Sequence, residues 1–286
     1  MALNLPVFYQ RTGSAIVFAA VMLMGLLWTN TAYYVLIALI SVLCMRDYFR
    51  LMKKIDPSSY WPGWLPVCVH VISLSLITMS YGFAEFFGGE KLLIVREGLP
   101  IAAIIPAIIL IAGILLNKPT VNAIMQALGG LFYITVPMVF MMFMRGNDMI
   151  IPIALILLIW TNDTMAYLVG SFVGKTPFSP ISPKKTWEGT GGGALLTMIG
   201  AMTYGYFSGR YRLVDWAVLG LCAGVAGTLG DLVESKLKRM ADVKDSGTLM
   251  PGHGGALDRF DSLLLAAPFA GAYVYYFMQL PAYVVP

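Results

Sequence analysis

The chain has 286 residues, of which 58% are hydrophobic and only 12% are charged. Soluble globular domains carry about 25% charged residues, so this composition excludes an ordinary soluble fold and indicates an integral membrane protein. The formal net charge is only +4 and no segment resembles a nucleic-acid-binding module, so we expect no nucleic-acid partner.

Apolar runs of about 20 residues, the length that a helix needs to cross the hydrocarbon core of a bilayer, recur along the whole chain. They predict an all-α, polytopic membrane protein with about nine transmembrane helices, folded as one integral membrane domain over residues 1–286. Residues 1–120 would form the N-terminal spans, and residues 121–286 would form the spans that carry the functional groups. The predicted spans are residues 14–30, 31–45, 63–83, 99–116, 121–144, 149–172, 189–208, 213–235 and 260–280. The first run lacks a convincing cleavage site and is followed directly by another span, so we expect it to be retained.

The basic residues are unevenly divided between the two sides that these spans define. With the N-terminus in the cytoplasm, most of the 19 Lys and Arg residues fall on the cytoplasmic side. Because basic residues favour that side in membrane proteins, we expect the N-terminus inside and the C-terminus outside. The loops over residues 173–188 and 236–257 then face the cytoplasm. With no transit peptide, a bacterial inner membrane is the expected location.

The eighth predicted helix carries a polar face at its cytoplasmic end. Asp231, Glu234, Ser235 and Lys238 are spaced by three and four residues, so they share one side of the helix. Asp231 lies close to the expected boundary of the hydrocarbon, where an ionised carboxylate needs a partner. This face is therefore a candidate for a functional site.

The ninth predicted helix brings further carboxylates to the same depth. Asp258 and Asp261 lie one turn apart at its start, and the two helices run in opposite directions, so Asp231 should lie near them. Oxygen ligands of this kind suit Mg²⁺ or Mn²⁺ with bound phosphates. Alternatively, these acids only form ion pairs at the inner face. The basic residues available for such pairs are Lys238, Arg239 and Arg259.

The segment PGHGG, residues 251–255, precedes the ninth helix. Its glycines allow the backbone to approach a ligand, and the following helix offers free N–H groups to an anion. His253 could donate to a phosphate, move a proton or order the loop. A simple row of ion pairs needs neither a Gly-Gly turn nor a histidine, so this segment favours a metal and phosphate site.

A second polar set lies upstream. Asp163 interrupts an apolar run, and an acid inside a membrane span is a candidate functional residue, although it could also make a helix-packing hydrogen bond. Lys184 and Lys185, just after Ser182, suit a polyphosphate or simply add inner-face charge. Glu188 is either linked to a metal or a favourable acid in the first turn of a helix.

Two of these segments resemble a known family. The 27 residues from Ser235 to Asp261 resemble the signature of the phosphatidate cytidylyltransferases, also called CDP-diacylglycerol synthases. The segment DTMAYLVGSFVGK, which begins at Asp163, and the later SPKKTWEG resemble that family's other typical block. The resemblance covers the C-terminal half closely, whereas the N-terminal half is similar only in being hydrophobic.

The resemblance implies an enzyme that transfers CMP from CTP to phosphatidic acid, giving CDP-diacylglycerol and pyrophosphate in phospholipid biosynthesis. Its expected partners are CTP, phosphatidic acid and the lipid bilayer, with a possible homodimer through the glycine-rich face of helix 213–235. Its expected cofactor is Mg²⁺ or Mn²⁺, with a possible second cation.

The resemblance and the spacing together assign three groups of residues. The expected catalytic residues are Asp231, Asp258, Asp261, Lys238, Arg239 and His253. The expected substrate-binding residues are Ser182, Lys184, Lys185, Ser235, Lys244, Asp245, Gly254, Gly255 and Arg259. The expected metal ligands are Asp231, Asp258 and Asp261, with Asp163 and Glu234 as further candidates.

Two other classes of protein stay open at this point. A related lipid enzyme, such as a polyprenol kinase, would transfer the γ-phosphate of CTP and release CDP. A transporter would use Asp163 and the glycine-rich helices to line a path, but its functional charges should then be distributed through the membrane depth. The charges of this chain gather at one face instead.

Overall fold

A computed structural model of the chain describes residues 5–86, 108, 112, 115, 120–249 and 254–278. The chain divides into two compact units, which are described separately. Unit 1 contains residues 1–142 and 237–260, and unit 2 contains residues 143–236 and 261–286. The predicted span over residues 99–116 lies outside the described residues except at positions 108, 112 and 115.

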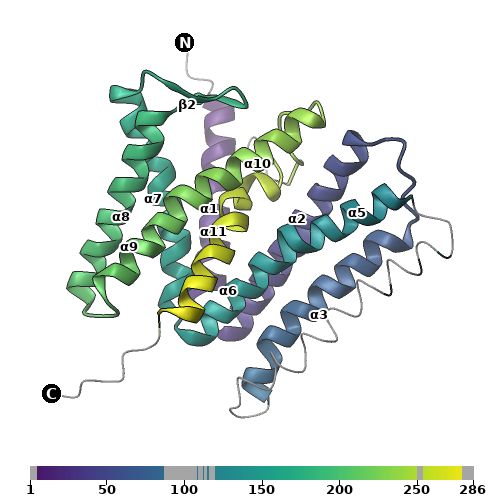
Figure 1. Cartoon of the computed structure of the whole chain (residues 1–286), viewed down its shortest axis with the longest axis horizontal. Helices are drawn as coiled ribbons and strands as arrows, with labels where there is room; N and C mark the ends of the chain where they lie inside the picture. The colour runs from purple at the N-terminus through teal and green to yellow at the C-terminus, as the bar shows by residue number, and fades with distance from the viewer. Residues whose placement is uncertain are drawn as a thin grey trace. The chain divides into compact units, whose positions relative to one another are not determined.

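The described residues are mainly helical, as the apolar runs predict (Figure 1). The helices are α1 (Leu5–Leu27), α2 (Asn30–Ile55), α3 (Trp64–Phe86), α5 (Val121–Gly130), η1 (Leu131–Thr135), α6 (Val136–Asn147), α7 (Ile150–Val173), α8 (Trp187–Ser208), α9 (Leu213–Leu221), η2 (Cys222–Ala226), α10 (Gly227–Met240) and α11 (Leu257–Tyr276). The elements η1 and η2 are single π turns inside longer helices. A short antiparallel hairpin of β1 (Pro177–Ser179) and β2 (Ser182–Thr186) was not anticipated from the sequence.

Within the described residues, three helical runs are long and apolar enough to cross a membrane: Val121–Asn147, Ile150–Val173 and Leu213–Met240. The second helix follows the first directly, as predicted, because α1 ends at Leu27 and α2 begins at Asn30. Thr29 caps α2 by accepting a hydrogen bond from the amide of Ala32 at 3.0 Å. The three long apolar helical runs confirm the prediction of a helical membrane protein.

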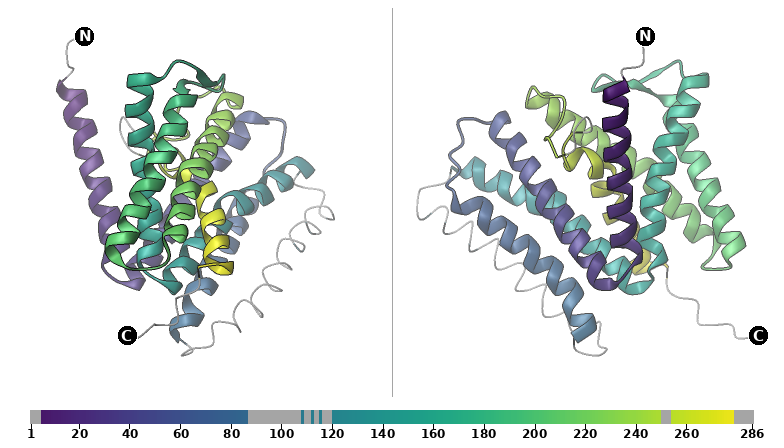
Figure 2. Two further views of the ribbon diagram at one scale, coloured as in Figure 1. Left: turned by 60° about the vertical axis from the view of Figure 1, so that its left-hand side comes forward. Right: turned by 180° about the vertical axis from the view of Figure 1, so that it is seen from behind.

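Unit 1 packs α2 against α1, α3, α5 and the π turn η1 (Figure 2). A buried apolar face of α2, which includes Ile37 and Cys44, supplies much of this packing. Three helices also share a buried polar link. Ser73 of α3 is hydrogen-bonded to Ser41 at 2.9 Å and accepts a hydrogen bond from Thr135 at 2.8 Å. Hydroxyl groups of this kind hold helices together where water is excluded.

Unit 2 is built on close contacts between α7, α8 and the run from α9 to α10. Glycine makes these contacts possible. A Cβ on Gly224 would lie 2.8 Å from Cα of Ala194 on α8, and a Cβ on Gly193 would lie 2.8 Å from Cα of Ala166 on α7. Small residues at such positions let helix backbones approach closely in a membrane. The glycines of the run 213–240 therefore face neighbouring helices of the same unit.

At the start of α9, unit 2 contains a buried acid with a full set of donors. Asp215 is 2% exposed and accepts hydrogen bonds from the backbone amide and guanidinium of Arg212 at 2.9 to 3.1 Å and from the hydroxyl of Tyr273 at 2.8 Å. The interaction joins α9 to α11. Asp215 is consequently a structural residue.

We predict that Asp215→Asn lowers the thermal stability of the purified protein. The amide side chain keeps the shape but loses the charge that Arg212 and Tyr273 bind, which should cost about 2 kcal/mol, since hydrogen bonds to charged groups contribute roughly 1.5–3 kcal/mol. Thermal unfolding in detergent measures the effect, with the exposed Asp242→Asn as the matched control. Equal melting temperatures for the two variants would contradict the structural role of Asp215.

Candidate active site

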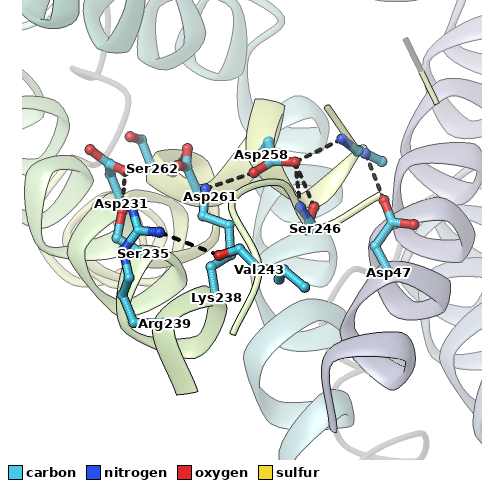
Figure 3. A network of polar contacts seen from close by, with 12 residues as sticks. Asp47, Asp231, Ser235, Lys238, Arg239, Val243, Ser246, Asp258, Asp261 and Ser262 are labelled. Carbon is cyan, nitrogen blue, oxygen red and sulfur yellow. Dashed lines mark hydrogen bonds and ion pairs between the residues drawn. The ribbon is translucent and has the colours of Figure 1, made fainter. Parts of the chain in front are cut away.

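Unit 2 brings three carboxylates together. Asp231 and Glu234 project from α10 and Asp261 projects from α11, and one oxygen of each lies within 4.8 Å of the others. Figure 3 shows Asp231 and Asp261 of this group. Glu234 is fully buried, whereas Asp231 and Asp261 are partly exposed. Asp163 of α7 adds a further negative charge within electrostatic range of Asp261. We refer to Asp231, Glu234 and Asp261 as the carboxylate cluster.

A glycine allows the two helices to place the carboxylate cluster. A Cβ on Gly230 would lie 2.5 Å from the backbone oxygen of Asp261 and 3.2 Å from Cα of Ser262. Any larger residue at position 230 would push α10 and α11 apart. Since Asp231 is the next residue, the close contact at Gly230 fixes the approach of Asp231 to Asp261.

A lysine and a serine contact the carboxylate cluster. Lys185 of strand β2 forms an ion pair with Asp231, and the hydroxyl of Ser235 donates to Oδ1 of Asp231 at 3.3 Å. Carboxylates this close repel one another, and the Lys185 ammonium compensates part of the charge of Asp231. The donor set consists of oxygen atoms alone, which is the set that a hard divalent cation prefers.

The hairpin that carries Lys185 is held by Glu188, at the start of α8. The Glu188 carboxylate accepts hydrogen bonds from the amide of Lys175 at 3.1 Å and from the amide and hydroxyl of Thr176 at 3.1 and 2.8 Å. Its own backbone amide and these donors lower the pKa of Glu188 from 4.5 to about 2. Of the two sequence interpretations of Glu188, the structure favours the acid in a first helical turn, with the added role of fixing the hairpin.

A second polar network lies in unit 1, around Asp258 at the start of α11. Its Oδ1 accepts a hydrogen bond from Lys238 at 2.7 Å (Figure 3). Its Oδ2 accepts from the amide and hydroxyl of Ser246, both at 2.8 Å, and from the amide of Gly255 at 2.7 Å. The Asp258 side chain is only 6% exposed. These donors show that Asp258 anchors the loop between α10 and α11; its role as a metal ligand stays a prediction.

The remaining predicted site residues fall into both units. Within unit 1, Arg239 donates to the backbone oxygen of Val243 at 3.4 Å, and Gly254 has a φ of +83°, which favours glycine. His253 lies outside the described residues. The other predicted residues of unit 1 are Lys244, Asp245 and Arg259, all of them exposed. The predicted residues of unit 2 are Asp163, Ser182, Lys184, Lys185, Asp231, Glu234, Ser235 and Asp261.

Sequence reasoning missed Asp47, a fully buried acid in the C-terminal half of α2. Its Oδ2 accepts a hydrogen bond from the amide of Ala256 at 2.7 Å. The rule that selected Asp163, an acid within an apolar run, did not apply, because Asp47 lies just beyond the predicted span over residues 31–45. The neighbouring Arg46 and Arg50 made Asp47 look like part of a charged helix end.

Comparison with known proteins decides the family. Residues 9–277 match the sequence profile of the Cytidylyltransferase family. The chain belongs to this family. Among curated members, the chain is 48% identical over 126 residues to the phosphatidate cytidylyltransferase of Synechocystis sp., a match that covers 43% of this chain and 41% of the relative.

Two more relatives carry the same description. The chain is 41% identical over 128 residues to the phosphatidate cytidylyltransferase of Haemophilus influenzae, covering 43% of this chain and 44% of the relative. It is 47% identical over 113 residues to that of Bacillus subtilis, covering 39% of this chain and 42% of the relative. The matched segment thus spans less than half of the length of these curated relatives. The family resemblance inferred from the two sequence segments is confirmed.

We predict that Glu188→Gln loosens the hairpin 177–186. The neutral amide accepts weaker hydrogen bonds from Thr176 and Lys175, so their backbone amides should exchange with deuterium faster, while amides inside α8 serve as the internal reference. In the wild-type protein, the contribution of Glu188 is complete above about pH 4.5 and is lost as the pH falls toward 2, because its pKa is lowered. Unchanged exchange at Thr176 would show that Glu188 does not hold the hairpin.

Proposed function

We propose that the protein is a phosphatidate cytidylyltransferase, which transfers CMP from CTP to phosphatidic acid and releases CDP-diacylglycerol and pyrophosphate. The observation that carries this proposal is the carboxylate cluster with Lys185 beside it, in a member of the Cytidylyltransferase family. Oxygen ligands next to a lysine suit a metal-bound triphosphate. The curated relatives that share part of the sequence bear the same activity in their names.

We propose Mg²⁺ or Mn²⁺ as the cofactor of the carboxylate cluster. Opposite oxygens around Mg²⁺ are separated by about 4.2 Å, twice the usual bond length, and Mg²⁺ usually takes one or two carboxylates with several waters. The cluster spreads over at most 4.8 Å, so two direct ligands and a third through water would fit. When bound, the cation would neutralise charge on the phosphates of CTP. Asp163 is a further candidate ligand, and a second cation is a further prediction.

The reaction needs positioning more than a strong base. A phosphatidate oxygen, already anionic near neutral pH, forms a bond to the α-phosphorus of CTP, and the bond from that phosphorus to the bridging oxygen of pyrophosphate breaks. Lys185 is placed to balance negative charge beside Asp231, and Lys184 is the next residue on β2. Holding both phosphate groups in line is worth several powers of ten in rate.

Other residues keep roles that rest on the family resemblance. We propose that Ser182 and Ser235 contact substrate from unit 2. Substrate contacts by Lys238, Arg239, Lys244, Asp245, His253, Gly254, Gly255 and Arg259, and metal binding by Asp258, stay predictions. The homodimer stays a prediction as well. Its proposed glycine surface contacts α8 and α11 within unit 2, so a dimer would need another face.

For the membrane arrangement, we propose one integral domain with nine spans, the N-terminus in the cytoplasm and a bacterial inner membrane as the location. In the described residues, continuous helical runs coincide with the predicted spans on both sides of residues 99–116. The loops over residues 173–188 and 236–257 would face the cytoplasm, where CTP is found.

We predict that single cysteines at Lys175 and Thr248, in a variant without Cys44, Cys68 and Cys222, are labelled by an impermeant maleimide from the cytoplasmic side only. Both positions are exposed, and Lys175 contacts Glu188 through its backbone, so its side chain is replaceable. Inverted and right-side-out vesicles distinguish the two sides. Trp28→Cys, which is exposed at the opposite end of α1, should show the reverse pattern. Labelling of Lys175→Cys and Thr248→Cys from opposite sides would disprove the proposed topology.

The decisive assay incubates purified protein and phosphatidic acid with CTP that carries one label in the cytosine ring and another on the γ-phosphate. Ring label in the lipid extract supports cytidylyl transfer. γ-Phosphate label in the lipid would indicate a kinase, and a lipid extract without either label would exclude both enzymes.

We predict that this activity is lost in excess EDTA and that Asp231→Asn and Glu234→Gln each lower the rate at least about 10²-fold, which corresponds to roughly 2.7 kcal/mol. Both changes keep the side-chain size and remove one charge from the proposed metal site. They should also weaken Mn²⁺ binding, which paramagnetic resonance measures without substrate.

The matched control is Asp242→Asn, an exposed acid with a φ of 51° that asparagine also adopts readily. It should keep both the rate and Mn²⁺ binding. Wild-type rates in Asp231→Asn and Glu234→Gln, at matched thermal stability, would remove the cluster from the mechanism.

A further inference from the structure

The buried acid Asp47 holds a segment that is 209 residues away in the sequence. Its Oδ2 accepts the backbone amide of Ala256 at 2.7 Å, within unit 1 (Figure 3). A hydrogen bond from a charged acceptor to a backbone amide is stronger than a neutral one. Asp47 therefore ties the residue before α11 to the C-terminal half of α2.

Two glycines fit against the same carboxylate. A Cβ on Gly247 would lie 2.6 Å from Oδ1 of Asp47, and a Cβ on Gly255 would collide with its Oδ2 and lie 2.5 Å from Oγ of Ser246. Both ends of the loop from Ser246 to Ala256 thus rest on Asp47. At these two positions the absence of a side chain is required by the contact with Asp47.

Asp258 completes the arrangement. It accepts the amides of Ser246 and Gly255, while Asp47 accepts the amide of Ala256. Successive amides of the chain at Gly255 and Ala256 are therefore bound by two different carboxylates. One carboxylate comes from the helix that follows the loop, and the other comes from the N-terminal part of the chain.

Burial of the Asp47 carboxylate costs free energy, and the hydrogen bond to the loop offsets this cost. Burying a carboxylate in an apolar helix is unfavourable, and its ion pairs with Arg46 and Arg50 are long, at 3.5 and 3.9 Å. Those two arginine side chains are 42% and 52% exposed, so they compensate the buried charge weakly. The short hydrogen bond to Ala256 is the strong interaction of this acid.

We propose that Asp47 is a positioning residue for cytidylyl transfer. It acts through Gly247, Gly255 and Ala256, whose backbone it fixes at both ends of the loop from Ser246 to Ala256. It does not touch the substrate. This inference rests on the proposed function. It assigns a role in the reaction to the N-terminal half of the chain, which the signature segments leave without one.

The test compares Asp47→Asn and Asp47→Ala with the wild-type enzyme in the cytidylyl-transfer assay. A misplaced loop should lower kcat, by about 10²-fold for Asp47→Ala, since errors near 1 Å in placement have effects of that size. Asp47→Asn keeps an acceptor for Ala256 and should lose less. Asp56→Asn, at the residue that follows α2, is the matched control, because its carboxylate contacts Ser58, Ser59 and Asn122 and its loss should leave kcat unchanged.

A double-mutant cycle shows whether Asp47 acts through the loop. Gly247→Ala should lower kcat because its Cβ meets Asp47, and combining it with Asp47→Ala removes that collision, so the double variant should lose less than the product of the two single effects. A labelling measurement within the loop accompanies this mutant cycle. Thr248 is exposed, and a cysteine at this position should react faster with a maleimide in the Asp47→Ala variant than in the protein that keeps Asp47.

The outcomes separate the two proposals. A wild-type protein that transfers no cytidylyl group would overturn the proposed function itself. An active wild type with full kcat in Asp47→Ala, or a loss of kcat with multiplicative effects and unchanged labelling at position 248, would overturn the positioning role alone. Should Asp47→Ala fail to fold, the nearly isosteric Asp47→Asn and the Gly247→Ala variant give the same comparison.

Discussion

An ionised carboxylate inside an apolar chain has to find compensating charge or hydrogen-bond donors, and the polar structure of both units follows from how this requirement is met. Asp215 is compensated by Arg212 and Tyr273, and Asp258 by Lys238 and backbone amides. In each case the acid joins segments that are separate in the chain. The acids are thus part of the architecture as well as candidates for chemistry.

The carboxylate cluster meets the same requirement in a different way. Three acids converge on one another, and the glycine at position 230 allows the backbones to come close enough for this. Placing like charges together is unfavourable, so the arrangement needs protons, hydrogen-bond donors or positive charge to offset the repulsion. Lys185 supplies part of it, from a hairpin that is itself fixed by Glu188. The cation and the charged substrate proposed above would add further positive charge and hydrogen-bond donors to this group.

The sequence predicted the helices well because their lengths are set by apolar runs, and it placed Asp231 and Glu234 on one face because that depends only on helical spacing. It did not predict the hairpin, because strands of three and five residues are too short to show an alternating pattern. It could not reveal Asp47, because the amide that this acid binds belongs to a residue 209 positions later. Contacts with the backbone leave no trace in side-chain patterns, which is also why the backbone donors to Asp258 were not foreseen, whereas its ion pair with Lys238 was among the alternatives.

Because of the π turn η2, the direction in which Asp231 points depends on the number of residues in its helix as well as on their identity. A π turn accommodates one extra residue, and one residue corresponds to about 100° of rotation around an α-helix. Before and within this turn, Gly220 and Gly224 face α8, and after it Gly227 and Gly230 face α11. A gain or loss of one residue here would turn Asp231 away from Asp261 without altering either acid. Among relatives, the number of residues across this turn should therefore be held as strictly as the acids themselves, while the surface loops are free to vary in length.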